Sequence, residues 1–158
     1  MSELVVRNRQ RVRRVNTPLL RRIVRSLLVE DVRLEAHELC IHLVGLVEMA
    51  RVNRRYLDHA GSTDVIAFDH SEGEGGSRRL HGEVFVCVDE AIFNASQFRT
   101  TWQSEVLRYI VHGILHLRGH DDKRPAARRR MKIEENRLLR ALTRRFTLSK
   151  LERRRGRA

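Results

Sequence analysis

The segment 112–122 (HGILHLRGHDD) constrains this chain most, because it brings five potential metal ligands together: His112, His116, His120, Asp121 and Asp122. Apolar residues recur at helical spacing before it, which predicts an amphipathic helix over residues 104–117. His112 and His116 are four positions apart and would share one face of that helix. Their Cβ atoms would lie ~5–6 Å apart, close enough for both rings to bind one ion.

A third ligand requires the chain to turn. On a continuous helix His112 and His120 would be ~12 Å apart, too far to share a metal. Gly119 is suited to end the helix, because glycine adopts the left-handed conformation common at helix C-termini. His120, Asp121 or Asp122 can then approach the ion. Two histidines and a carboxylate, or three histidines, with an open fourth position form a catalytic zinc site.

Other interpretations of the histidine pair are weaker. Two histidines four apart on a helix are often only partly buried polar residues, but the glycine followed by further ligands favours a metal site. The zinc-protease motif H-E-x-x-H places a general base directly after the first ligand. Gly113 occupies that position here, so such a peptidase is disfavoured. A 2-His-1-carboxylate iron enzyme uses the same ligand types and stays open.

The segment 112–122 resembles the signature H-G-x-L-H-L-x-G-[YH]-D-H of the YbeY family, bacterial endoribonucleases implicated in ribosomal RNA maturation. Residues 53–56 (NRRY) and 62–68 (STDVIAF) are similar to the family's N-x-x-[YF]-R and P-T-D-V-L-S-F blocks. Residues 81–86 (HGEVFV) are similar to its L-G-D-I-x-I strand. The resemblance covers roughly residues 40–140.

The chain departs from the family pattern at two positions. Leu57 stands where an arginine follows the aromatic residue, and Asp122 stands where the third histidine falls. The resemblance implies one Zn²⁺ held by His112, His116 and Asp122. Geometry also favours Asp122 over His120, because the residue directly after the glycine would have to reverse abruptly. A carboxylate oxygen at ~2.0–2.2 Å is an ordinary zinc ligand.

The catalytic acid or base stays open. Arg54 lies three positions before Leu57, on the same helix face, and is a candidate replacement for the missing guanidinium. Asp64 and Glu83 are candidates by resemblance to the family's strand blocks, although a carboxylate that caps a turn fits equally well. His120 is a candidate to bind phosphate or carry a proton, given its unperturbed pKa of ~6.5.

The charge of the chain points to a polyanionic partner. Its net charge is +12, its isoelectric point is near 11.2, and arginines crowd residues 7–25 and 128–157. The alternative is a solvated surface, or a GC-rich genome that favours arginine. With one Trp, two Tyr and five Phe, we expect RNA binding mainly through phosphate contacts and shape rather than stacking.

The element pattern predicts an α+β fold: a single domain over residues 1–142, with a small mixed β-sheet covered by helices and the metal-binding helix lining a cleft. Thr17 is the expected N-cap of the first helix. Residues 143–158 are expected to form a flexible basic tail. The expected strands are 4–6, 38–44, 64–68 and 81–88, with a loop over 69–79, and the expected helices are 17–28, 48–57, 89–98, 104–117 and 126–142.

The compartment is expected to be the cytoplasm. No apolar run approaches the ~20 residues of a membrane span. Residues 1–14 lack the apolar core of a signal peptide. Cys40 and Cys87 are expected to be buried free thiols in a reducing environment.

Three functions compete on this sequence. The preferred one is a zinc-dependent single-strand endoribonuclease that acts in 16S ribosomal RNA maturation and ribosome quality control, with precursor RNA and the small ribosomal subunit as partners. The alternative is a non-catalytic ribosome-assembly or RNA-binding factor with a structural metal, which the loss of arginine at Leu57 favours. The third is a hydrolase of another substrate class.

Overall fold

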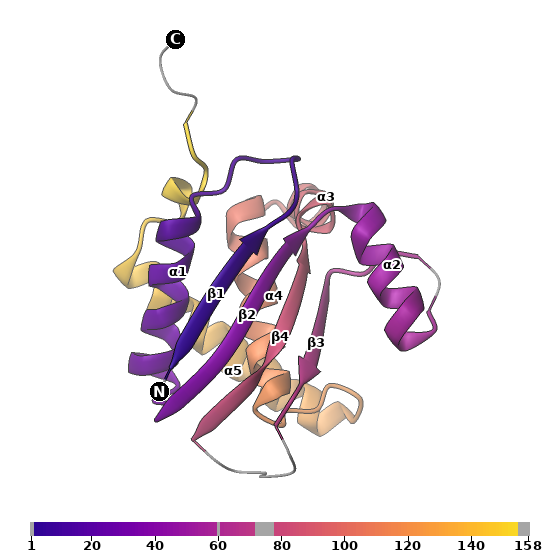
Figure 1. Ribbon diagram of the computed structural model, residues 1–158. Helices are drawn as coiled ribbons and strands as arrows, with labels where there is room; N and C mark the ends of the chain where they lie inside the picture. Colours follow the sequence, from indigo (N-terminus) through magenta and orange to yellow (C-terminus); the bar gives the residue numbers. More distant parts are fainter. Residues whose placement is uncertain (1, 60, 72–77, 155–158) are drawn as a thin grey trace.

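The computed structural model describes residues 2–59, 61–71 and 78–154. Within these ranges the fold is α+β, with one four-stranded mixed sheet and α4 and α5 behind it (Figure 1). The strands are β1 (Glu3–Asn8), β2 (Ala36–Val44), β3 (Val65–Asp69) and β4 (Arg79–Cys87). The helices are α1 (Thr17–Ser26), α2 (Leu46–Leu57), α3 (Val88–Phe98), α4 (Trp102–Leu117) and α5 (Pro125–Arg145), with a π-helical turn η1 (Leu27–Asp31) and a 3₁₀ turn η2 (Leu148–Leu151).

The sheet has the strand order β1-β2-β4-β3. β2 pairs in parallel with β1 and with β4, and β3 pairs antiparallel with β4. Because side chains alternate along a strand, β2 divides its residues between two cores. Leu39, Ile41 and Leu43 belong to the main core with α1, α4 and α5, whereas Val44 packs with Met49 of α2 on the other face.

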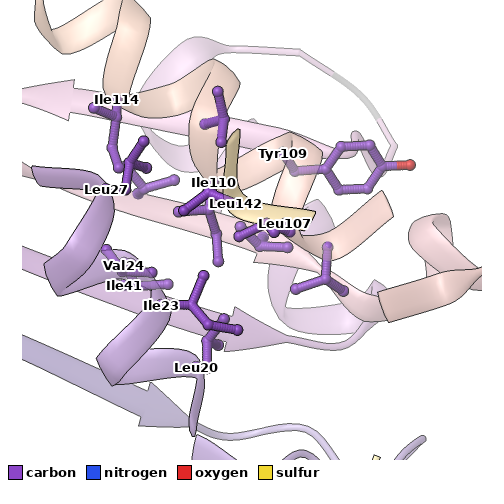
Figure 2. Packing of buried hydrophobic residues seen from close by; sticks show 14 of the residues in the cluster. Leu20, Ile23, Val24, Leu27, Ile41, Leu107, Tyr109, Ile110, Ile114 and Leu142 are labelled. Atoms are coloured by element: carbon purple, nitrogen blue, oxygen red, sulfur yellow. The ribbon is translucent and has the colours of Figure 1, made fainter. Parts of the chain in front are cut away.

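The main core forms around α4. Figure 2 shows Leu107, Ile110 and Ile114 of α4 among Leu20, Ile23 and Val24 of α1, Ile41 of β2 and Leu142 of α5. Fully burying one such side chain contributes about 1.5–3 kcal/mol. This packing holds α4 at a fixed place against the sheet, and with it the two histidines in its last turns.

Gly113 allows α4 to approach the sheet closely. A Cβ at this position would lie 2.6 Å from Cγ1 and 3.1 Å from Cγ2 of Val84 in β4. Close packing against Val84 therefore explains why a glycine, and not the glutamate of the zinc-protease motif, follows His112.

Two details of the structure differ from what the sequence predicts. Asn16, not Thr17, caps α1: its Oδ1 accepts a hydrogen bond from the Leu19 N–H at 3.2 Å. Both cysteines are free thiols, but Cys40 is only half-buried, because it lies on the less covered face of the sheet.

The loop expected over 69–79 falls between β3 and β4, and its residues 72–77 lie outside the described ranges. None of the helices in the described ranges combines the length and hydropathy needed to cross a bilayer.

The expectation of a flexible tail from residue 143 is wrong for residues 143–154. α5 continues to Arg145, and η2 follows with Leu151 only 1% exposed. The carbonyl of Leu151 accepts a hydrogen bond from the Asn16 N–H at 2.7 Å, and the Arg153 N–H donates to the Arg14 carbonyl at 2.8 Å. A few apolar residues in this basic segment are enough to fix it, because they reach the main core beside α1.

Candidate metal centre

The turn after α4 is a complete Schellman motif. Gly119 has φ +92°, its N–H donates to the His116 carbonyl at 2.9 Å, and the His120 N–H donates to the Leu115 carbonyl at 3.0 Å. This is the hydrogen-bond pattern of a helix that ends with a left-handed glycine. The chain therefore reverses where the sequence predicts, and residues 120–122 return toward the last turns of α4.

Three side chains converge after this reversal. Nε2 of His112 lies 3.0 Å from Nε2 of His116, and Oδ2 of Asp122 lies 3.6 Å and 3.3 Å from these two atoms. Two ligands bound ~2.0–2.2 Å from one tetrahedral ion are roughly 3.3–3.6 Å apart. The two distances to Asp122 fall in this range, and the distance between the two Nε2 atoms is about 0.3 Å shorter, so a small outward shift of the rings lets the three atoms share one small cation. Their side chains are 26%, 31% and 40% exposed, which leaves an open side for a further ligand.

The outer nitrogen of each ring has a hydrogen-bond acceptor. Nδ1 of His112 donates to Oε2 of Glu135 at 2.9 Å, and Nδ1 of His116 donates to the carbonyl of His120 at 3.1 Å. With the proton on Nδ1, a neutral imidazole presents its lone pair on Nε2. The two lone pairs then face each other, an arrangement that a bound cation stabilises. Such partners orient histidine ligands in zinc sites.

Glu135 is the functional residue that the sequence reasoning missed. Its side chain is 4% exposed, and it also accepts a hydrogen bond from Arg108 at 2.7 Å. Burial acts to raise the pKa of Glu135, but the hydrogen bonds from His112 and Arg108 lower it to about 2. Burial acts to lower the pKa of His112, but the hydrogen bond to Glu135 and the negative charges of Glu135, Asp122 and Asp64 together more than offset this and raise it. The available signal was a glutamate within the apolar stripe of Met131, Leu138 and Leu142 on α5.

The centre opens into a pocket of about 500 Å³, bounded by α3, α4, α5 and the start of β3. His112 and Asp122 line it, and so does Asp64. Oδ1 of Asp64 accepts a hydrogen bond from the Val65 N–H at 2.8 Å. Asp64 therefore both caps the start of β3 and faces the pocket beside the centre.

The other catalytic candidates lie elsewhere or act through the backbone. Arg54 lines a separate pocket with Arg51 and Asp58. His120 supplies its backbone carbonyl to His116, and its side chain is not part of the three-residue ligand group. Glu83 lies in β4 next to Val84, which packs against α4, so the alternation of the strand directs Glu83 to the opposite face of the sheet.

Glu83 belongs to a hydrogen-bonded network on that opposite face. Cys40, His42 and Glu83 also have ligand atoms within 4.8 Å of one another. However, Nδ1 of His42 accepts from Arg9 at 3.1 Å, so the ring donates its Nε2 proton to Glu83 at 2.8 Å. His70 contacts the second oxygen of Glu83 at 2.8 Å. His42 is thus a strand residue held by hydrogen bonds, and it lies within the strand expected over 38–44.

The comparison with known proteins agrees with the motif. The family model described as "Endoribonuclease YbeY" matches residues 5–143. The chain belongs to the YbeY family. The match begins 35 residues before the region 40–140, where the sequence motifs carry the resemblance, and ends three residues after it.

Curated relatives in the YbeY family carry the same name. "Endoribonuclease YbeY" of Chlorobium luteolum is 36% identical over 142 residues, which is 90% of this chain and 99% of that protein. The protein of this name from Bacteroides fragilis is 42% identical over 92 residues, 58% of this chain and 63% of the relative's length. The solution structure of TM1509 from Thermotoga maritima has the same fold, with a TM-score of 0.65 at 20% identity over 90% of this chain and 91% of that chain.

Proposed function

We propose that this YbeY-family chain is a zinc-dependent endoribonuclease that cleaves single-stranded precursor ribosomal RNA during 16S maturation and ribosome quality control in the cytoplasm. The observation that carries the proposal is the convergence of His112, His116 and Asp122 at 3.0–3.6 Å beside an open pocket. The names of the curated relatives support RNA as substrate, and so does the net charge of +12.

The chain's own residues prepare the site for one ion. Glu135 and the His120 carbonyl hold the Nδ1 protons, so that both Nε2 atoms are available as ligands. When bound, zinc supplies Lewis acidity: it lowers the pKa of water toward ~7 and stabilises negative charge on a phosphate. The mixed nitrogen and oxygen donor set suits zinc.

Asp64 is the best placed proton acceptor among the sequence candidates. It lines the same pocket as His112 and Asp122, whereas Glu83, the other candidate carboxylate, lies on the opposite face of the sheet. A carboxylate beside a reacting phosphate can take a proton from a ribose hydroxyl or from water. We assign this role to Asp64 as part of the proposal.

The test combines metal analysis with an RNA-cleavage assay. Purified wild-type protein is expected to contain about one equivalent of metal, mostly zinc, and to cleave single-stranded RNA. His116→Ala should lose both properties. His81→Ala is the matched control, because His81 is exposed and pairs with Glu38 on the other face of the sheet. Cleavage by protein that is free of metal and still folded would overturn the proposal.

One observation favours a second function. Leu57 occupies the position of the family arginine, and Arg54 does not reach the pocket that contains His112. A non-catalytic ribosome-assembly factor with a structural metal would need no such guanidinium. The same experiment separates the two, because this factor would bind zinc and RNA but leave the RNA intact.

A further inference from the structure

Beyond the ligand atoms, the 500 Å³ pocket combines an apolar wall with a cationic rim. Val65 and Met131 contribute apolar surface, and Phe98, at the end of α3, is 71% exposed. Arg128 and Lys132 line the pocket from the first turns of α5. Its volume lies within the ~300–1,000 Å³ of pockets that hold small ligands.

The cations are placed to contact a phosphate. Arg128 and Lys132 are four residues apart on α5, so they share one helix face. Arg128 is exposed and forms no side-chain hydrogen bond or ion pair with any residue in the described ranges. Lys132 is 60% exposed but also pairs with Glu135 at 3.4 Å. The charge of Arg128 is therefore available to an anion, and the Lys132 ammonium, which has three N–H donors, can contact the same anion while it stays beside Glu135.

Phe98 is placed to contact an aromatic ring. One exposed phenylalanine needs no explanation by itself. Phe98, however, borders the same pocket as His112, Arg128 and Lys132, whereas Phe93 on the same helix is 58% exposed and does not line it. Bases of single strands commonly stack on such side chains, whatever their sequence.

We propose that this pocket binds the RNA nucleotide next to the scissile phosphate, an inference that rests on the proposed function. The base of this nucleotide packs on Phe98, and the phosphate on its far side from the scissile bond contacts Arg128 and Lys132. The bond to be cleaved then lies at the end of the pocket that His112 and Asp122 form. One local stacking contact of this kind selects unpaired RNA, because a base within a duplex presents no free face. The pocket thus gives a physical reason for single-strand preference.

The test measures binding separately from cleavage. Affinity for a short 2′-O-methyl phosphorothioate RNA is measured by fluorescence anisotropy for wild type, Phe98→Ala and Phe93→Ala. Loss of a base–aromatic stack should weaken binding about 5- to 100-fold for Phe98→Ala, and Phe93→Ala should match wild type. One abasic nucleotide, moved along the oligonucleotide, should at one position weaken wild type but not Phe98→Ala. Equal affinities of the two phenylalanine variants would overturn the stacking contact.

The phosphate contact is tested by the salt dependence. Arg128→Ala should reduce the slope of log K against log[salt] by about 0.7, the value for one phosphate of a single strand. Arg129→Ala is the matched control, since Arg129 neighbours Arg128 but does not line the pocket. Equal changes in both variants would overturn the contact. If wild type shows the predicted binding pattern but leaves unmodified RNA intact, the proposed function fails, and the pocket stands as a binding site for an unpaired nucleotide beside the metal centre. If it cleaves RNA without the pattern, the pocket assignment alone fails.

Discussion

The Glu135 carboxylate accepts a hydrogen bond from Nδ1 of His112 at 2.9 Å, across the interface between α5 and α4. The two residues are 23 positions apart in the sequence. The orientation of a candidate ligand on α4 therefore depends on a residue of α5. Because Arg108 binds the same carboxylate at 2.7 Å, the glutamate stays ionised although it is buried.

Replacing Glu135 should weaken metal binding without removing a ligand. Glu135→Gln keeps the side-chain volume but removes the charge that holds the His112 proton on Nδ1. We expect zinc affinity to fall by about 10-fold or more, within the ~10–100-fold range for residues that support a metal ligand. Chelator competition measures this. Glu134→Gln is the control, since Glu134 pairs with Arg137 on the surface. Unchanged affinity of Glu135→Gln would show that the hydrogen bond is only structural.

The identity of the third ligand can be decided with three alanine variants. Asp122→Ala removes the oxygen that lies 3.3 Å from Nε2 of His116, so zinc affinity should fall by more than the ~100-fold typical of supporting residues. His120→Ala should retain zinc, because its backbone carbonyl is the group that contacts His116. Asp121→Ala should also retain zinc, since its carboxylate accepts the Lys123 N–H instead. Loss of zinc in His120→Ala with retention in Asp122→Ala would reverse the assignment.

The local parts of the site can be predicted from the sequence. Helical periodicity places His112 and His116 on one face, and Gly119 marks the reversal that brings residues 120–122 back. Both signals act within a few residues, so no knowledge of the packing of α5 is needed. The third position follows from chain geometry for the same reason.

The parts that depend on distant contacts cannot be predicted in this way. In the sequence, Glu135 is one acidic residue in a basic helix, and nothing near it indicates a contact with His112. That contact depends on how α5 packs against α4. The composition of the end of the chain predicts a charged, flexible segment, because its many arginines outweigh the three apolar residues Phe146, Leu148 and Leu151. These three residues pack on the main core because α5 ends close to α1, so that the segment after it lies beside that helix.

Gly113 should be intolerant of a methyl group. In Gly113→Ala the new Cβ would lie 2.6 Å from Val84 Cγ1, and a β-branched side chain has little freedom to move away. Overpacking of this kind costs about 1–3 kcal/mol. A gain in helix propensity of about 1 kcal/mol partly offsets it. Urea unfolding should show a net loss of stability.

The control for this prediction is a second substitution that makes room. Val84→Ala alone should destabilise the protein, but adding it to Gly113→Ala should cost less than the sum of the two single changes. Strict additivity, or a Gly113→Ala variant as stable as wild type, would contradict the close approach of α4 to β4.

Leu151 should contribute to stability as a core residue although it lies near the end of the chain. It is 1% exposed, and its carbonyl accepts the Asn16 N–H at 2.7 Å, next to the start of α1. Leu151→Ala should reduce the free energy of unfolding by about 2–5 kcal/mol, the range for buried leucines. Ser149→Ala, in the same 3₁₀ turn but exposed, should stay within about 0.5 kcal/mol of wild type. If Leu151→Ala unfolds at the wild-type urea concentration, the segment after α5 does not contribute to the core in solution.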